Sequence, residues 1–139
     1  MVRMLTVSSP ALALGGFICK NAPMWKTAVL ANPQARKNKR RADLAGHAGE
    51  RFGRSVPVIL TNDLDALRRE IPKIEAQRYD LLLVYGGDGT FRHFYEAWFN
   101  VLGEKAAPPP VYPVAGGSQN YVCRDTGTST AGARSHILK

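Results

Sequence analysis

The stretch "YDLLLVYGGDGTFRHFYEAW", residues 79–98, decides the fold. Its run Leu81–Tyr85 is apolar on both faces, which is typical of a central strand in a parallel sheet. The turn Gly86–Thr90 follows at once and places three glycines around one carboxylate. Glycine admits backbone angles that a Cβ forbids and lets the backbone come close to a ligand. The stretch therefore predicts a buried strand that ends in a turn suited to ligand binding.

Short apolar runs alternate with amphipathic segments on both sides of this stretch. The runs predict strands at residues 27–31, 56–60, 80–85 and 111–114. The second strand is expected near a sheet edge, because Pro57 cannot donate to a ladder of hydrogen bonds. Helices are expected at about residues 40–52, after a cap at Thr61 or Asn62, and from Thr90 to Leu102. This order predicts an α/β fold: an open, mostly parallel sheet with helices on both faces.

Apolar side chains in the second and third expected helices repeat at helical spacing. They are Leu64, Leu67, Ile71 and Ile74 in one, and Phe91, Phe94, Tyr95, Trp98, Val101 and Leu102 in the other. Pro72 lies within the first set, so we expect a kink there or a split into two helices. We interpret the aromatic side of the later helix as core rather than as a ligand surface.

The turn after the central strand has the chemistry of an anion site. In open α/β sheets, ligands bind outside the carboxyl ends of the strands. The first N–H groups of a helix beginning near Thr90 have no partner within the helix, and the helix dipole adds positive charge, which suits phosphate. Asp88 would repel phosphate unless a Mg²⁺ ion stood between them. The alternative is a tight turn in which Asp88 only caps the helix.

Residues 79–102 resemble the nucleotide-binding core of the diacylglycerol kinase catalytic superfamily, which includes bacterial lipid kinases and sphingosine kinases. The NAD kinases share the GGDGT turn. Two further stretches resemble the lipid kinases: "VLANPQARKNK" with Asn32 and Pro33, and "VYPVAGGSQNYVCRDTG" with Gly117, Ser118 and Asn120. The Asn-Pro pair favours the lipid kinases over the NAD kinases.

The resemblance implies a Rossmann-like nucleotide-binding domain that uses ATP and Mg²⁺. It implies transfer of the ATP γ-phosphoryl group to a lipid hydroxyl, such as that of diacylglycerol. Asp88 is the expected catalytic and metal-binding residue. The expected cofactor-binding residues are Asn32, Pro33, Gly86, Gly87, Asp88, Gly89, Thr90, Gly117, Ser118 and Asn120.

The chain also departs from the family pattern. Ala35-Arg36 stands where Ser-Gly is usual, and Gln119 stands where a glycine is usual. Family enzymes continue into a second, mostly β domain that holds the lipid and carries a candidate general base. We therefore expect a poorly ordered extension at residues 1–23, the nucleotide-binding domain at 24–127 and a flexible tail at 128–139, without the second domain. A catalytically silent nucleotide-binding module and an NAD kinase are the alternative functions.

Composition and charge limit the partners. The 139 residues fit one domain, and no apolar run approaches the roughly 18 residues needed to cross a bilayer. The net charge of +8, concentrated in Arg36–Arg41, favours polyanionic partners. We expect a nucleotide and a lipid at a membrane surface rather than nucleic acid, because no nucleic-acid-reading module occurs. The two cysteines match no disulfide framework, so we expect a cytoplasmic protein, peripheral at the membrane. The oligomeric state is left open.

Overall fold

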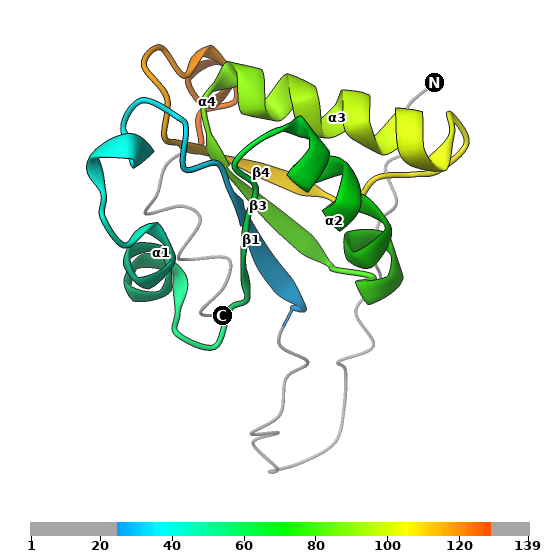
Figure 1. The fold of residues 1–139 in the computed structure, drawn as a ribbon, viewed down its shortest axis with the longest axis horizontal. Coiled ribbons are helices and arrows are strands. Elements are labelled where there is room, and N and C mark those ends of the chain that lie inside the picture. Colours follow the sequence, from blue (N-terminus) through cyan, green and yellow to red (C-terminus); the bar gives the residue numbers. More distant parts are fainter. Residues whose placement is uncertain (1–24, 129–139) are drawn as a thin grey trace, which may run out of the picture.

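A four-stranded parallel sheet forms the centre of the computed structural model, which describes residues 25–128 (Figure 1). The strands are β1 (Thr27–Ala31), β2 (Val58–Leu60), β3 (Leu81–Gly86) and β4 (Val111–Ala115), in the spatial order β2-β1-β3-β4. All three strand pairs are parallel. The predictions of an α/β fold, of β3 as a central strand and of an edge position for β2 are confirmed.

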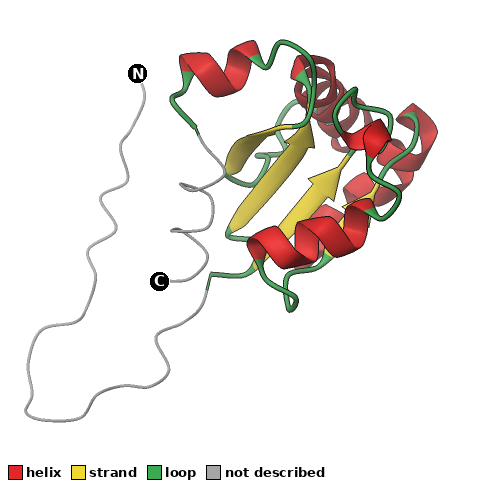
Figure 2. Ribbon diagram, turned by 90° about the vertical axis from the view of Figure 1, so that its left-hand side faces the viewer, coloured by secondary structure: helices red, strands yellow, loops and turns green. Residues whose placement is uncertain are grey.

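Helices cover both faces of this sheet (Figure 2). They are the 3₁₀ helix η1 (Asn38–Arg40) and the α-helices α1 (Leu44–Phe52), α2 (Leu64–Gln77), α3 (Asp88–Leu102) and α4 (Tyr121–Asp125). Helix α1 packs on one face, while α2 and α3 pack together on the other. Within residues 25–128, no helix has the length and apolar character that crossing a membrane would require.

The alternation of side chains along β3 explains why helices pack on both faces of the sheet. Successive strand residues point to opposite faces, so a strand covered on both sides must be apolar throughout. Leu82 and Val84 pack against α2 and α3, whereas Leu83 and Tyr85 pack against α1. Every residue of β3 is buried. The unbroken apolar run in the sequence is therefore explained by burial on both faces.

The strand register brings the carboxyl ends of β1, β3 and β4 level with one another. Ala31 is paired with Tyr85, and Gly86 is paired with Ala115. The loops that leave these strands therefore begin at the same edge of the sheet. That edge carries the residues that the sequence singled out.

Helix α1 begins at Leu44 rather than near residue 40. Asp43 caps it by accepting a hydrogen bond from the Gly46 N–H at 2.9 Å. The residues just before it form η1 instead of the first turn of α1. The predicted apolar face is confirmed, since Leu44, Ala48 and Phe52 are buried.

Helix α2 also differs from its prediction at the start. Asp63 caps it, not Thr61 or Asn62, and its carboxylate accepts a hydrogen bond from the Ala66 N–H at 2.7 Å. The predicted split at Pro72 is wrong, because α2 runs without interruption through that residue. Proline inside a helix loses one backbone hydrogen bond and crowds the carbonyl one turn earlier, and the burial of the helix face offsets this cost.

Burial corrects the expected positions of two apolar side chains. Leu64 and Val101 were expected on apolar helix faces but are 42% and 39% exposed. Helix α4 was not predicted, because its sequence follows a turn rich in glycine and serine and is only five residues long. The prediction for residues 1–23 lies outside the described residues, and only Thr128 of the expected tail is described.

Truncating a core side chain of α3 should be far more costly than truncating its exposed neighbour. Trp98 is 1% exposed and Phe99 is 38% exposed. We expect Trp98→Ala to lower the free energy of unfolding by about 3–5 kcal/mol and Phe99→Ala to lower it by about 1 kcal/mol or less. Urea unfolding followed by circular dichroism measures both. Equal losses would contradict the assignment of Trp98 to the core.

Candidate functional site

Three loops meet where β1, β3 and β4 end. They comprise residues 32–37, 86–90 and 115–120, and they include the last residue of β3, the first residues of α3 and the last residue of β4. Backbone hydrogen bonds join them directly: the Gly116 N–H donates to the Gly86 carbonyl at 2.8 Å, and the Lys37 N–H donates to the Gly116 carbonyl at 2.9 Å. The glycine turn after β3 and the glycine turn after β4 thus form one structure.

Two glycines allow these turns to touch backbone to backbone. A Cβ added to Gly117 would lie 2.5 Å from the Gly87 Cα, and one added to Gly87 would lie 3.2 Å from the Gly117 Cα. The first contact is shorter than a Cβ tolerates, and the second is tighter than most Cβ contacts. Close approach therefore requires glycine at position 117 and is favoured by glycine at position 87.

The glycines of this turn do not serve to adopt backbone angles that other residues avoid. The described glycines with positive φ are Gly53, Gly103 and Gly127, none of which lies in the GGDGT turn. Gly86 instead makes room for the side chain of Thr90, which an added Cβ would overlap. Gly89 differs from the others, because an added Cβ there would meet nothing within 4 Å.

The N-terminus of α3 opens at the same place. Gly87 is the N-cap, and no side chain caps the helix. The N–H groups of Asp88, Gly89 and Thr90 come first in the helix and have no acceptor one turn earlier within it. Thr90 is buried, and its Oγ1 accepts a hydrogen bond from Asn32 Nδ2 at 3.0 Å. Thr90 is therefore a residue of the first turn, not the helix cap.

The carboxylate of Asp88 is bonded to a different helix from the one in the alternative interpretation, in which it caps α3. Oδ2 accepts from the Tyr121 N–H at 3.1 Å, and Oδ1 accepts from the Val122 N–H at 2.9 Å. Asp88 therefore caps α4 rather than α3. Each carboxylate oxygen has a second lone pair, so these bonds do not exhaust its capacity as an acceptor.

A hollow of about 400 Å³ lies over the glycine turns. Its lining includes seven of the ten expected residues: Asn32, Gly87, Asp88, Gly89, Thr90, Gly117 and Ser118. Pro33, Gly86 and Asn120 do not line it. Asn120 is buried behind the turn: its Oδ1 accepts from the Gly117 N–H at 2.9 Å, and its Nδ2 donates to the Gly117 carbonyl at 3.0 Å.

Residues 26–138 match the family model described as the diacylglycerol kinase catalytic domain. The chain belongs to this family. The resemblance in the sequence is thereby confirmed. No curated protein matches the sequence.

Three solved structures have a fold similar to that of this chain. A crystal structure of a diacylglycerol kinase from Bacillus anthracis str. Sterne is similar with a TM-score of 0.56 at 20% identity, over 84% of this chain. Two further structures from that strain give the same TM-score and identity. The chain spans 42% of the length of the first of these structures. At this identity the likeness supports the fold alone.

A second hollow of about 550 Å³ adjoins the first, between the ends of β1 and β2 and the start of α2. Its lining is Asn32, Thr61, Asn62, Asp63, Leu64, Asp65, Leu67, Arg68, Thr90 and His93. Asn32, Thr90 and His93 line both hollows. The sequence does not predict this hollow, because Thr61 and Asn62 carry only the pattern of helix caps.

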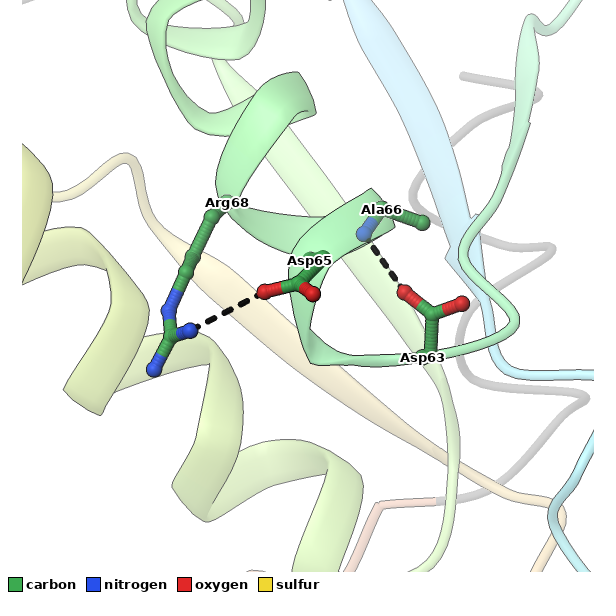
Figure 3. Close-up of polar contacts among 4 residues, drawn as sticks. All are labelled: Asp63, Asp65, Ala66 and Arg68. Carbon is green, nitrogen blue, oxygen red and sulfur yellow. Dashed lines mark hydrogen bonds and ion pairs between the residues drawn. The ribbon is translucent and has the colours of Figure 1, made fainter.

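The start of α2 forms one rim of this second hollow (Figure 3). The Asp63 carboxylate is turned to the backbone of α2, where it accepts from the Ala66 N–H. Arg68 Nη1 lies 3.1 Å from Asp65 Oδ1 on the surface of the same helix. The acidic side chains of this rim are thus partly neutralised by groups of α2.

Asp88 is the one acidic side chain that lines the first hollow. Among residues 25–128, no three His, Cys, Asp or Glu side chains are grouped as metal ligands. Mg²⁺ commonly binds proteins through one or two carboxylates, with waters and substrate phosphates as its other ligands. The donor set here therefore fits a magnesium ion carried in with a nucleotide, rather than one held by the protein alone.

Cys123 lies behind Asp88 at the base of α4. Burial raises the pKa of the Cys123 thiol, and the negative charge of Asp88 acts in the same direction. The thiol therefore stays protonated at neutral pH and is a poor nucleophile. The other polar groups at the site include the backbone N–H groups at the start of α3, Asp88 and the hydroxyl of Thr90.

Two glycine-to-alanine changes should differ in their effect on stability. We expect Gly117→Ala to lower the free energy of unfolding by about 1–3 kcal/mol, because the new Cβ overlaps the Gly87 backbone. Gly89→Ala should leave it unchanged or raise it by up to about 1 kcal/mol, since alanine favours the helix and the added methyl meets no atom. Thermal unfolding of both variants checks this. A stable Gly117→Ala variant would disprove the close contact of the turns.

Proposed function

We propose that this chain is the nucleotide-binding domain of an ATP-dependent lipid kinase, with the domain at residues 24–127. The proposed reaction transfers the γ-phosphoryl group of ATP to a lipid hydroxyl, such as that of diacylglycerol. One observation carries this proposal: the joined glycine turns leave the N-terminus of α3 open toward a hollow that contains a single carboxylate. Phosphoryl transfer depends mostly on positioning and on neutralising charge, and both need such a surface.

The N–H groups at the start of α3 are the proposed phosphate-binding groups. They point out of a helix N-terminus whose dipole favours negative charge. Gly89 is exposed and has free space where a side chain would stand, so a phosphate can approach the backbone there. The Thr90 hydroxyl, which accepts a hydrogen bond from Asn32, is left to donate its proton to a phosphate oxygen.

Asp88 is the proposed magnesium ligand. A magnesium ion bound with the nucleotide would neutralise phosphate charge beside this carboxylate. Asp88 also fixes α4 through the Tyr121 and Val122 N–H groups. These two bonds fix the orientation of the carboxylate, and Asp88 lines the first hollow.

The nucleoside is proposed to extend into the second hollow. Asn32, Thr90 and His93 line both hollows, so the hollows adjoin at these residues and a ligand with its phosphates at α3 lies close to the second one. Thr61 and Leu67 supply a buried hydroxyl and an apolar surface there. A base and a ribose need both kinds of contact.

The basic segment Arg36–Arg41 supports the proposal that the protein works at a membrane surface. Its five cations are exposed and form no ion pair within the described part of the chain. Arg36 lines the first hollow, so this charge lies beside the proposed phosphate site. We propose a cytoplasmic protein that binds peripherally to anionic lipid, where clusters of Lys and Arg add attraction.

A silent nucleotide-binding module is the second candidate. The engagement of both Asp88 oxygens with α4 favours it, since that bonding gives the residue a structural role. The two candidates differ in one assay: γ-labelled ATP with vesicles that contain diacylglycerol. Labelled lipid supports the kinase, and magnesium-dependent binding of ATP without labelled lipid supports the module. NAD as acceptor in the same assay tests for an NAD kinase, which the Asn32-Pro33 pair disfavours.

Calorimetric titration of Mg·ATP tests the nucleotide site. We expect saturable, magnesium-dependent binding by the natural chain and a loss of about tenfold or more in affinity for Asp88→Asn. Gly89→Ala should also bind weakly although it folds, because its methyl occupies the phosphate position. Asp125→Asn is the matched control: it removes one exposed carboxylate from α4 and should bind normally.

Two outcomes would contradict the nucleotide site. One is the absence of heat from a natural chain that circular dichroism shows to be folded. The other is equal weakening in the Asp88→Asn and Asp125→Asn variants, which would point to a general effect of charge. Because Asp88→Asn also alters the cap of α4, its helix content and thermal midpoint should be compared with those of the control.

A further inference from the structure

Asn38 is a buried amide within the most basic segment of the chain. It is 1% exposed, whereas Lys37 and Lys39 on either side of it are exposed. The sequence pattern does not predict that Asn38 is buried while its charged neighbours are exposed. The contacts of its side chain explain the difference.

The amide of Asn38 contacts all three loops of the site. Its Nδ2 donates to the Asn32 carbonyl at 2.9 Å and to the Tyr85 carbonyl at 3.2 Å. Both hydrogens of the amide are therefore used by the loop after β1 and the end of β3. On its other side it packs on Gly116, where an added Cβ would lie 2.8 Å from both Nδ2 and Oδ1.

The chemistry at this position requires a neutral donor of this size. Two carbonyl oxygens face one end of the side chain, so a carboxylate there would be repelled by both. The opposite atom, Oδ1, is buried and has no hydrogen-bond partner among the described residues. A buried unpaired acceptor is unfavourable. The unpaired Oδ1 indicates that the side chain acts at this position through the hydrogen bonds of its NH₂ group.

We propose that Asn38 is a positioning residue for nucleotide binding, an inference that rests on the function proposed above. It fixes the Asn32 backbone, and Asn32 in turn donates from its side chain to Thr90 Oγ1. It also fixes the Tyr85 carbonyl, one residue before the glycine turn. Asn38 thereby sets the distance between the Asn-Pro turn and both glycine turns without touching the ligand.

A pair of complementary substitutions separates this positioning role from simple packing. Asn38→Ala removes the amide and leaves a space, and Gly116→Ala adds a methyl group that overlaps the amide. In the double variant, the methyl of Ala at position 116 fills the space left at position 38. We expect each single variant to have a lower thermal midpoint and the double variant to recover most of the loss. Its affinity for Mg·ATP should stay reduced by about tenfold or more, because each carbonyl keeps only its backbone donor, the Ala35 N–H for Asn32 and the Asn32 N–H for Tyr85, and neither regains the side-chain donor.

Ile74→Val supplies a control of matched stability. Ile74 is 1% exposed and belongs to the core between α2 and the sheet. This variant should lose stability but keep the natural affinity for Mg·ATP. If Ile74→Val weakens binding as much as Asn38→Ala does, or if the double variant recovers full affinity, the positioning role is disproved.

Amide hydrogen exchange tests the inference independently of nucleotide. In the double variant without ligand, we expect faster exchange at residues 32–35 and 86–90 than in the natural chain, with unchanged exchange in α2. Unchanged exchange in these loops would overturn the inference. If the natural chain binds no Mg·ATP but the exchange rates change as expected, the proposed nucleotide site fails while the role of Asn38 in fixing the loops is upheld.

Discussion

The contact between the Gly87 and Gly117 backbones is the constraint on which the rest of the site depends. Parallel register places the ends of β3 and β4 level, and the two turns then fold toward each other until a Cβ at Gly117 would lie 2.5 Å from Gly87 Cα. This approach fixes the start of α3 against the loop that leads to α4. An open helix N-terminus beside a hollow is the consequence, and the proposed phosphate site depends on it.

Asp88 serves two structures at once. It is the first residue of α3, and its carboxylate receives the first two N–H groups of α4. A carboxylate bonded in this way has a defined orientation, which a metal ligand needs. The same bonds mean that any change of Asp88 also affects α4. The structural role and the proposed metal-binding role are therefore physically linked.

The sequence predicted the layered core well and the ends of its elements less well. Runs such as Leu81–Tyr85 have only one stable environment, because burial on both faces is the only way to remove so much apolar surface from water. Helix starts were misplaced, since Asp43 and Asp63 each had polar neighbours able to cap a helix. Helix α4 was missed because a bond from a distant residue, Asp88, holds its first turn.

The sequence by itself determined the alternation of strands and helices, the central place of β3 and the residues of the glycine turns. Those features depend on local composition and on periodicity, which are readable along the chain. Only the tertiary structure decided why the glycines are needed, what Asp88 holds and that Asn38 joins three loops. These depend on distances between segments far apart in the chain, and the packing of parallel strands at one edge of the sheet sets those distances.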